Sequence, residues 1–160
     1  LKFNFDVFNL ETDYDNQYIM IDAKLPIDDP RTTLSKENDI DQLKTLVTTF
    51  PKKFQTKLAT WKSRLESFRS NGQRVVLWGS GSKGVSFLTT LKVPEELEYV
   101  VDINPYRQGY FMSGTGHKIV GPEFLKDYQP DFVIVMNEIY CEEIGDSLRE
   151  IGLEPQIVAL

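Results

Sequence analysis

The sequence predicts a protein of the α/β class, in which helices cover both faces of a small, mostly parallel sheet. Three observations support this prediction. Short apolar runs alternate with helix-like segments from residue 73 to the end of the chain. These runs are continuously apolar, as expected for strands that are buried on both faces. One of them, at residues 75–78, leads directly into a glycine-rich turn, which is typical of a strand that is followed by a helix.

The composition is that of one globular domain, or of one domain with an appendage. The chain has 160 residues, of which 41% are hydrophobic and 12% aromatic, and this is enough for a packed core. Its 18 Lys and Arg residues stand against 24 Asp and Glu residues, so the formal net charge of −6 argues against a broad nucleic-acid-binding surface. The lone cysteine, Cys141, excludes an internal disulfide and a cysteine-rich metal site, and it favours a cytoplasmic location. No apolar run is long enough to cross a bilayer, and residues 1–5 lack the features of a signal peptide, so no membrane partner is expected.

Residues 1–25 are predicted to form a β-hairpin. Apolar and polar residues alternate from Phe3 to Leu10, turn-forming residues follow, and a second β-rich run covers residues 18–23. Because an isolated two-stranded hairpin is marginally stable in water, we expect these strands to pack on, or extend, a further sheet. The chain starts with leucine, so we expect it to be cut from a longer protein whose preceding domain ends in this hairpin. The polar residues 26–39 are predicted to be a linker.

A long helical region is predicted after the linker, from residue 40. Six apolar residues recur at intervals of three or four, which places them on one helical face that is expected to pack against the sheet: Phe50, Phe54, Leu58, Trp61, Leu65 and Phe68. Pro51 suits the first turn of a helix, so the sequence predicts a break or kink there, after a shorter helix over residues 40–48. Asn71 and Gly72 are predicted to end the helix.

The remaining elements complete a Rossmann-like domain, which includes the leading helix and spans residues 40–160. Strands are predicted at residues 73–78, 98–102, 118–120, 131–136 and 156–160. Helices are predicted at residues 83–91 and 142–151, with a short helix near residue 121. Ligands of such sheets bind beyond the carboxyl ends of the strands. The loops after Trp78, Asp102 and Met136 are therefore expected to meet at one cleft.

The loop that follows the first of these strands is the clearest functional signal in the chain. Gly79, Gly81 and Gly84 match the pattern G-x-G-x-x-G at the start of a helix. Glycines let the backbone turn sharply and approach a ligand, and the free N–H groups of a helix N-terminus attract an anion. The loop therefore predicts phosphate or pyrophosphate binding. Its other residues are Ser80, Ser82 and Lys83.

Several residues around this loop have two interpretations. Lys83 either contacts the phosphate or lies along the helix surface in water. Asp102 ends the second predicted strand, where the acid of a Rossmann fold accepts hydrogen bonds from ribose hydroxyls, but a turn or capping aspartate fits the position equally well. The sequence does not decide whether Tyr106, Arg107 and Gln108 contact a nucleotide or only decorate a loop.

The sequence contains no recognisable catalytic constellation. His117 has no evident acid, Tyr-Lys pair or metal partner, and Cys141 has no partner that would activate it as a nucleophile. Glu142 and Glu143 suit the first turn of a helix, where negative charge is favoured. Too little chain follows Gly72 for a binding fold and a substrate domain together, which argues against a dinucleotide-dependent oxidoreductase.

Three segments occur in order: residues 76–84 contain Gly-x-x-x-Lys-Gly, residues 100–109 contain Asp-x-x-Pro-x-Arg-Gln-Gly, and residues 130–144 contain Asn-x-x-Tyr-x-x-Glu-Ile. Together they resemble the C-terminal domain of S-adenosylmethionine-dependent sugar C-methyltransferases. The resemblance covers residues 40–160. The hairpin is in turn similar to the closing antiparallel strands of a class I methyltransferase domain. The chain departs from the family pattern at Gly81 and Ile103, where members often have proline and arginine.

The resemblance implies a role in methylating the carbon next to the keto group of a nucleotide-linked deoxysugar. In that reaction a proton is abstracted, an enolate forms, and the enolate attacks the methyl group of S-adenosylmethionine. The part implied for this chain is to bind the nucleotide-diphosphate sugar through Gly79, Ser80, Gly81, Ser82, Lys83, Gly84, Asp102, Asn104, Arg107, Gln108 and Asn137. S-adenosylmethionine, zinc and the catalytic base are expected in upstream domains, with the upstream methyltransferase domain as a partner. Alone, the chain is expected to bind without turnover.

Two other functions are compatible with the sequence. An NAD(P)-dependent oxidoreductase or an NAD(P)-sensing module would also use the glycine loop. A structural or dimerising domain would have the same fold with an empty glycine loop, and a homodimer is compatible with the sequence.

Overall fold

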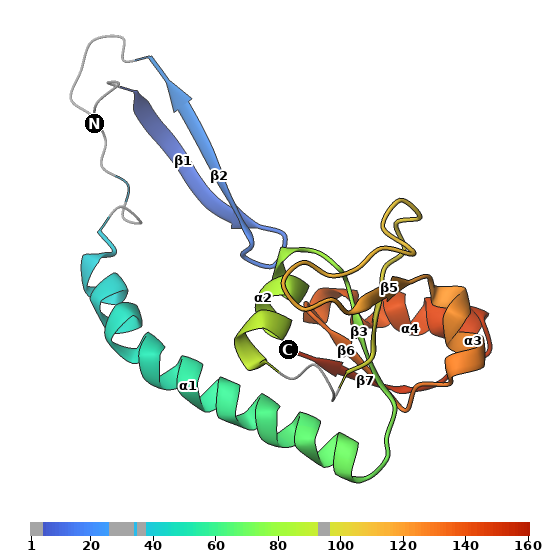
Figure 1. Cartoon of the computed structure of the whole chain (residues 1–160). Helices are drawn as coiled ribbons and strands as arrows, with labels where there is room; N and C mark the ends of the chain where they lie inside the picture. Colours follow the sequence, from blue (N-terminus) through green and yellow to red (C-terminus); the bar gives the residue numbers. More distant parts are fainter. Residues whose placement is uncertain (1–4, 26–33, 35–37, 93–96) are drawn as a thin grey trace. The chain divides into compact units, whose positions relative to one another are not determined.

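The computed structural model of the chain describes residues 5–25, 34, 38–92 and 97–160 (Figure 1). Its contacts divide the chain into two compact units, Leu1–Phe54 and Gln55–Leu160. Most of the predicted linker, residues 26–39, lies outside the described residues. Within the described ranges, no helix is both long enough and apolar enough to cross a membrane.

The first unit contains an antiparallel hairpin of β1 (Asp6–Asp13) and β2 (Tyr18–Lys24), as predicted. The turn residues 14–16 have φ angles between 51° and 59°, and these positive values reverse the chain. Directly paired residues share a face of the hairpin. One face is apolar, with Leu10 opposite Ile21, whereas on the other face Asn9 donates a 3.0 Å hydrogen bond to Asp22.

Helix α1 (Ile40–Ser70) runs without interruption through Pro51, so the helix break predicted at this proline is wrong. Proline removes one backbone hydrogen bond and adds a steric clash within a helix. In a helix of 31 residues this loss is local, and regular turns continue on both sides. The helix ends at Asn71 and Gly72 as predicted, and Gly72 has a φ of +66°.

The apolar stripe of α1 is buried only in its second half. Trp61, Leu65 and Phe68 are buried in the core, and Leu58 packs against them. The prediction that Phe50 and Phe54 also pack against the sheet is wrong, because they are 62% and 40% exposed and stack on one another. The strands of the sheet contain only three or four residues each, so the sheet covers only a few turns of the helix.

The second unit is built on a parallel sheet with the strand order β5-β4-β3-β6-β7. Its strands, all close to the predicted positions, are β3 (Val75–Trp78), β4 (Tyr99–Val101), β5 (Lys118–Val120), β6 (Phe132–Val135) and β7 (Gln156–Ala159). From the central strand β3 the chain adds β4 and β5 on one side, and then returns to add β6 and β7 on the other. The order therefore reverses between β3 and β6, and such a point is where open α/β sheets bind ligands.

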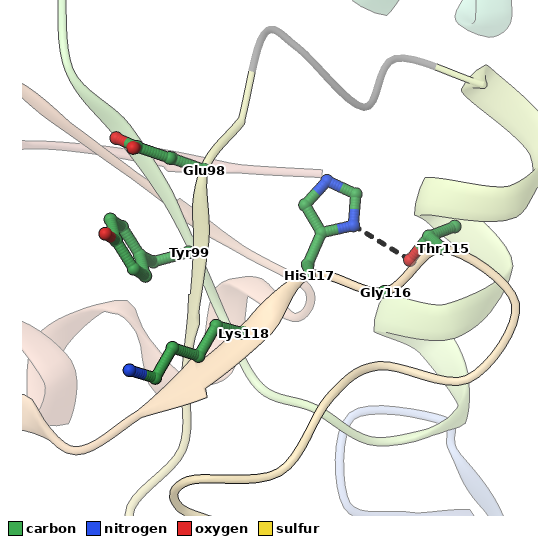
Figure 2. Close-up of a pocket in the computed structure, with 6 residues that line it drawn as sticks. All are labelled: Glu98, Tyr99, Thr115, Gly116, His117 and Lys118. Carbon is green, nitrogen blue, oxygen red and sulfur yellow. Dashed lines mark hydrogen bonds between the residues drawn. The ribbon is translucent and has the colours of Figure 1, made fainter.

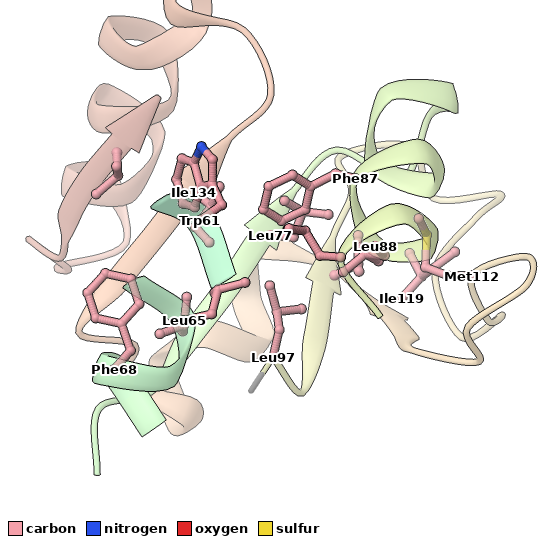
Figure 3. Packing of buried hydrophobic residues seen from close by; sticks show 14 residues of the cluster. Trp61, Leu65, Phe68, Leu77, Phe87, Leu88, Leu97, Met112, Ile119 and Ile134 are labelled. Atoms are coloured by element: carbon pink, nitrogen blue, oxygen red, sulfur yellow. The ribbon is translucent and has the colours of Figure 1, made fainter. Parts of the chain in front are cut away.

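Helices cover both faces of this sheet, which confirms the predicted fold class. On one face the second half of α1 and helix α2 (Ser82–Leu91) pack against a cluster that includes Leu77 and Ile134 (Figure 3). On the other face helix α4 (Cys141–Glu150) and the short helix α3 (Leu125–Tyr128) pack against residues that include Val76 and Val133. Two 3-10 turns, η2 (Pro122–Phe124) and η3 (Glu138–Tyr140), precede α3 and α4.

Candidate functional site

Two glycines of the loop between β3 and α2 are required by the fold itself. Gly79 has a φ of +110°, which L side chains rarely adopt, and its N–H donates a 2.8 Å hydrogen bond to the carbonyl of Val101 in β4. A Cβ atom on Gly84 would lie 2.4 Å from the carbonyl oxygen of Gly79. The first turn of α2 therefore packs directly on the turn that ends β3, and only glycine at position 84 permits this approach.

Gly81 differs from these two glycines because nothing in the fold requires it. Its φ of −74° and ψ of −174° are ordinary for any residue, and a Cβ atom placed there would meet no atom within 4 Å. Gly81 is also the N-cap residue of α2, and no side chain caps this helix. The first N–H groups of a helix have no partner within the helix. The loop therefore presents an open backbone surface next to a helix N-terminus, where an anion is favoured.

Asp102 connects this loop to the end of β4. Its carboxylate is 7% exposed, and one oxygen, Oδ2, accepts hydrogen bonds from the backbone N–H of Ser80 at 3.0 Å and from the Ser80 hydroxyl. The guanidinium of Arg107 lies 3.3 Å from the same oxygen, and the N–H of Asn104 donates to Oδ1 at 2.9 Å. Burial by itself raises the pKa of Asp102, but the hydrogen bonds from Ser80, Asn104 and Arg107 outweigh it and lower the pKa below its usual 3.8.

The three predicted residues that follow Asp102 have two different roles. Arg107 faces the glycine loop, whereas Asn104 and Gln108 bind the backbone of their own loop. Arg107 is half exposed and its Nη1 lies 3.4 Å from the Ser80 hydroxyl, so its charge lies beside the glycine loop. Gln108 donates a 2.9 Å hydrogen bond to the carbonyl of Asp102, and its side chain lies against Gly121. Asn104 accepts a 3.0 Å hydrogen bond from the N–H of Tyr106. Gln108 and Asn104 thus stabilise the loop from inside.

The other predicted residues lie at the same edge of the sheet. Ser82 and Lys83 are exposed in the first turn of α2, and Lys83 forms no ion pair within the described residues. Asn137 follows β6 and caps η3, where its carbonyl accepts a 3.1 Å hydrogen bond from the N–H of Tyr140. The structure therefore brings together Ser80, Asp102 and Arg107 by direct contact. It places Lys83 and Asn137 at the same edge of the sheet, beyond the carboxyl ends of β3 and β6, and this edge is called the rim below.

A hollow of about 330 Å³ lies at the opposite edge of the sheet, where β4 and β5 begin (Figure 2). It is lined by Glu98, Tyr99, Thr115, Gly116, His117 and Lys118. His117 is 7% exposed, and its Nδ1 is hydrogen-bonded to the hydroxyl of Thr115 at 2.8 Å. Burial lowers the pKa of His117, although the backbone of Leu97 opposes this shift. A buried, neutral histidine far from the glycine loop is a structural residue and does not belong to the candidate site.

The described residues contain no group of three or more His, Cys, Asp or Glu side chains that could hold a metal ion. Burial and the carboxylate of Glu138 raise the pKa of the Cys141 thiol, which disfavours the nucleophilic thiolate form. Tyr106, which the sequence placed in a loop without deciding its role, is 87% exposed, the highest value among the large apolar side chains of the described residues. The turn-forming pair Asn104-Pro105 directly precedes it.

A family model described as the C-methyltransferase C-terminal domain matches residues 24–154. The chain belongs to this family. Membership confirms the resemblance to the C-terminal domain of C-methyltransferases. A C-terminal domain family also implies a partner domain upstream in the same protein.

Two further comparisons are less informative about this member of the C-methyltransferase C-terminal domain family. No protein with a curated description matches the chain. Among solved structures it is similar to UDP-D-quinovosamine 4-dehydrogenase from Vibrio fischeri, with 16% sequence identity and a TM-score of 0.41. That similarity covers 55% of this chain and 77% of the dehydrogenase chain.

Proposed function

We propose that this domain binds the diphosphate group of a nucleotide-linked sugar at the loop from Gly79 to Gly84. The protein would be an S-adenosylmethionine-dependent methyltransferase that acts on a keto-deoxysugar nucleotide. The single observation that carries the proposal is the open position of Gly81. The fold explains Gly79 and Gly84, whereas position 81 is open and its backbone suits any residue. A ligand that approaches the backbone there accounts for a small residue, glycine here and often proline in similar proteins, because a bulky side chain would occupy the ligand's space.

The charges around the loop support a diphosphate as this ligand. The uncapped N-terminus of α2 offers backbone N–H groups and a partial positive charge. Arg107 and Lys83 add two cationic groups on the same rim, and neither is buried. Asp102 neutralises part of the charge of Arg107 at 3.3 Å, and in return it fixes the guanidinium beside Ser80. The glycine loop therefore has one positioned cation, Arg107, beside it.

The internal hydrogen bonds of Asp102 change the part that this residue plays in the proposal. Three donors converge on its Oδ2 and one on its Oδ1. A carboxylate accepts about four hydrogen bonds, so little capacity is left for ribose hydroxyls. We infer that Asp102 positions Ser80 and Arg107, and that these two residues face the ligand.

The methyl transfer itself is assigned to the upstream partner domain. S-adenosylmethionine would supply the methyl group there, and zinc and the base that forms the enolate would belong to the same part of the protein. The described residues of this chain contribute binding and orientation of the sugar nucleotide. On this proposal the chain alone holds the nucleotide sugar without converting it.

The test uses the whole 160-residue chain and a Gly81→Trp variant in a thermal unfolding assay. Because a Cβ atom at position 81 meets no atom within 4 Å and the backbone there suits any residue, the variant is expected to unfold at about the same temperature as the native chain. Millimolar thymidine diphosphate glucose should raise the unfolding temperature of the native chain, since a ligand of the folded state stabilises it. The shift should be lost in the Gly81→Trp variant, whose ring would occupy the space of the ligand.

A Ser147→Ala variant in α4, on the other face of the sheet, serves as the matched control and should keep the full shift. The proposal is overturned if thymidine and uridine diphosphate sugars leave the native chain unchanged. It is also overturned if Gly81→Trp binds as the native chain does, because the glycine loop would then be a structural turn. A saturable shift with NAD or NADP alone would favour the dinucleotide-binding alternative.

A further inference from the structure

The loop between β4 and β5 presents a large aromatic side chain to solvent. Tyr106 is 87% exposed, and Ile103 in the same loop is 65% exposed. Apolar surface in water costs free energy, at about 25 cal/mol per Å². An exposed ring on a disordered loop would need no explanation, but this loop is ordered by hydrogen bonds.

The backbone on both sides of Tyr106 is fixed by short-range hydrogen bonds. The side-chain oxygen of Asn104 accepts a hydrogen bond from the N–H of Tyr106 at 3.0 Å, and the backbone carbonyl of Asn104 accepts one from the N–H of Arg107, also at 3.0 Å. Gln108 donates to the carbonyl of Asp102 at 2.9 Å and so closes the loop onto the end of β4. The loop therefore fixes the backbone from which the ring projects without burying the ring, and the packing of the fold gains little from this side chain.

Tyr106 also has a defined place relative to the glycine loop. The next residue, Arg107, reaches across to Ser80 and Asp102 at 3.4 and 3.3 Å. The Tyr106 backbone therefore lies on the same rim as the phosphate site proposed above. In sheets of this type a nucleotide extends from the glycine loop toward the end of the second strand, here β4. Tyr106 lies in the loop that follows that strand.

We propose that Tyr106 stacks on the nucleobase of a nucleoside diphosphate whose phosphates lie at Gly79–Gly84. This inference rests on the proposed function and adds the residue that recognises the base. An aromatic ring contributes to such binding through its face, and the contact needs no particular base and no hydrogen bond from the hydroxyl group. The ring, rather than the phenol oxygen, is therefore the functional part of Tyr106.

The experiment is calorimetric titration of the full chain with two probes, thymidine diphosphate and inorganic pyrophosphate. Only the first probe carries a base. Tyr106→Ala is expected to weaken thymidine diphosphate binding about 10-fold, because stacking on one aromatic side chain has an effect of this size. Pyrophosphate binding should stay within about twofold of the native value, and Tyr106→Phe should bind both probes as the native chain does.

Tyr110→Ala is the matched control, since Tyr110 is 67% exposed in the same loop but lies beside β5, where its carbonyl pairs with Ile119. Native binding of thymidine diphosphate by Tyr110→Ala is expected. The inference is overturned if Tyr106→Ala binds thymidine diphosphate as tightly as the native chain. Equal weakening of both probes by Tyr106→Ala would also overturn it, because the loop rather than the ring would then matter. If the native chain binds neither probe, the proposed function itself fails.

Discussion

Asp102 and His117 are equally buried, with 7% exposure each, but their surroundings differ. Asp102 lies at the carboxyl edge of the sheet, where the parallel strands end, and His117 lies at the amino edge, where they begin. At the carboxyl edge, three residues donate hydrogen bonds to Asp102, and its pKa is lowered so that the charged form is favoured. At the amino edge, burial of His117 is only partly compensated by the Leu97 backbone, and its pKa is lowered so that the neutral form is favoured. Burial alone therefore does not decide whether a group stays charged. Its hydrogen-bond partners do, as donors to a carboxylate or as acceptors from an imidazolium.

This difference follows from the direction of the strands. The carboxyl edge brings together the loop after β3 and the loop after β4, and both expose backbone N–H groups there. At the amino edge His117 meets the Thr115 hydroxyl, and the Leu97 backbone gives only partial support to a charged ring. A fold of this type thus presents backbone N–H groups that favour anions at its carboxyl edge, and it does not present them at its amino edge.

The largest expected effect comes from removing the charge at the carboxyl edge. Asp102→Ala should lower the free energy of unfolding by about 3 kcal/mol, because it leaves the Ser80 N–H and the Arg107 guanidinium without their shared acceptor. Urea denaturation at pH 7 measures this loss. Asp146→Asn on the exposed surface of α4 is the control and should change the stability by less than about 0.5 kcal/mol. A loss no larger than that of the control would show that Asp102 does not hold the two loops together.

A second comparison between the edges uses two glycines. Gly84→Ala at the carboxyl edge places a Cβ atom 2.4 Å from a backbone oxygen and should cost about 2 kcal/mol. Gly116→Ala at the amino edge meets no atom within 4 Å but has a φ of +74°, so it should cost only about 1 kcal/mol. Both values come from the same urea titration. Equal costs would mean that the contact between β3 and α2 is looser than the structure shows.

The sequence predicted the elements of the sheet and the edge at which the loops after β3 and β4 meet. Continuous apolar runs such as residues 75–78 are strands because both faces of the sheet are covered, and this signal is local. The glycine spacing located the turn after β3, since G-x-G-x-x-G describes a backbone path rather than a tertiary contact. For the same reason Asp102 was correctly placed at the end of a strand.

Contacts between distant residues were beyond the sequence. Ser80 and Asp102 are 22 positions apart, and their hydrogen bonds depend on the packing of β3 beside β4. The helical periodicity of α1 predicted that Phe50 and Phe54 lie on one face of the helix, but it did not show whether other residues cover that face. In the structure both rings are exposed. Periodicity defines which residues share a surface, whereas burial depends on what the rest of the chain places against it.

A smaller effect is expected from Arg107, the half-exposed partner of Asp102. Arg107→Gln should lower the free energy of unfolding by about 0.5 kcal/mol, because solvent screens an ion pair of this kind. The variant should also raise the pKa of Asp102, since one of the groups that lower it is gone. Carboxyl resonances followed by NMR during acid titration report this shift. An unchanged Asp102 pKa would show that the backbone and Ser80 hydrogen bonds alone keep the carboxylate charged.

The last expected effect is that the two edges contribute to the pH dependence of stability in different pH ranges. The pKa of His117 is lower in the folded chain than its usual 6.5, so the folded state binds the proton less readily than the unfolded state. Stability from the neutral His117 is therefore complete above about pH 6.5 and is lost as the pH falls toward the folded-state pKa. The corresponding loss from Asp102 begins only near pH 3.8, as the pH falls toward its lowered pKa. Denaturant titrations between pH 7.5 and about pH 5 therefore report the contribution of His117 to the free energy of unfolding without that of Asp102.

His117→Asn should flatten the pH dependence of the free energy of unfolding in that interval. Lys118→Gln, which lines the same hollow but is exposed, should leave this dependence unchanged. An identical slope in the native chain and in His117→Asn would mean that the amino edge accommodates a charged ring after all, and the contrast between the two edges would then be lost.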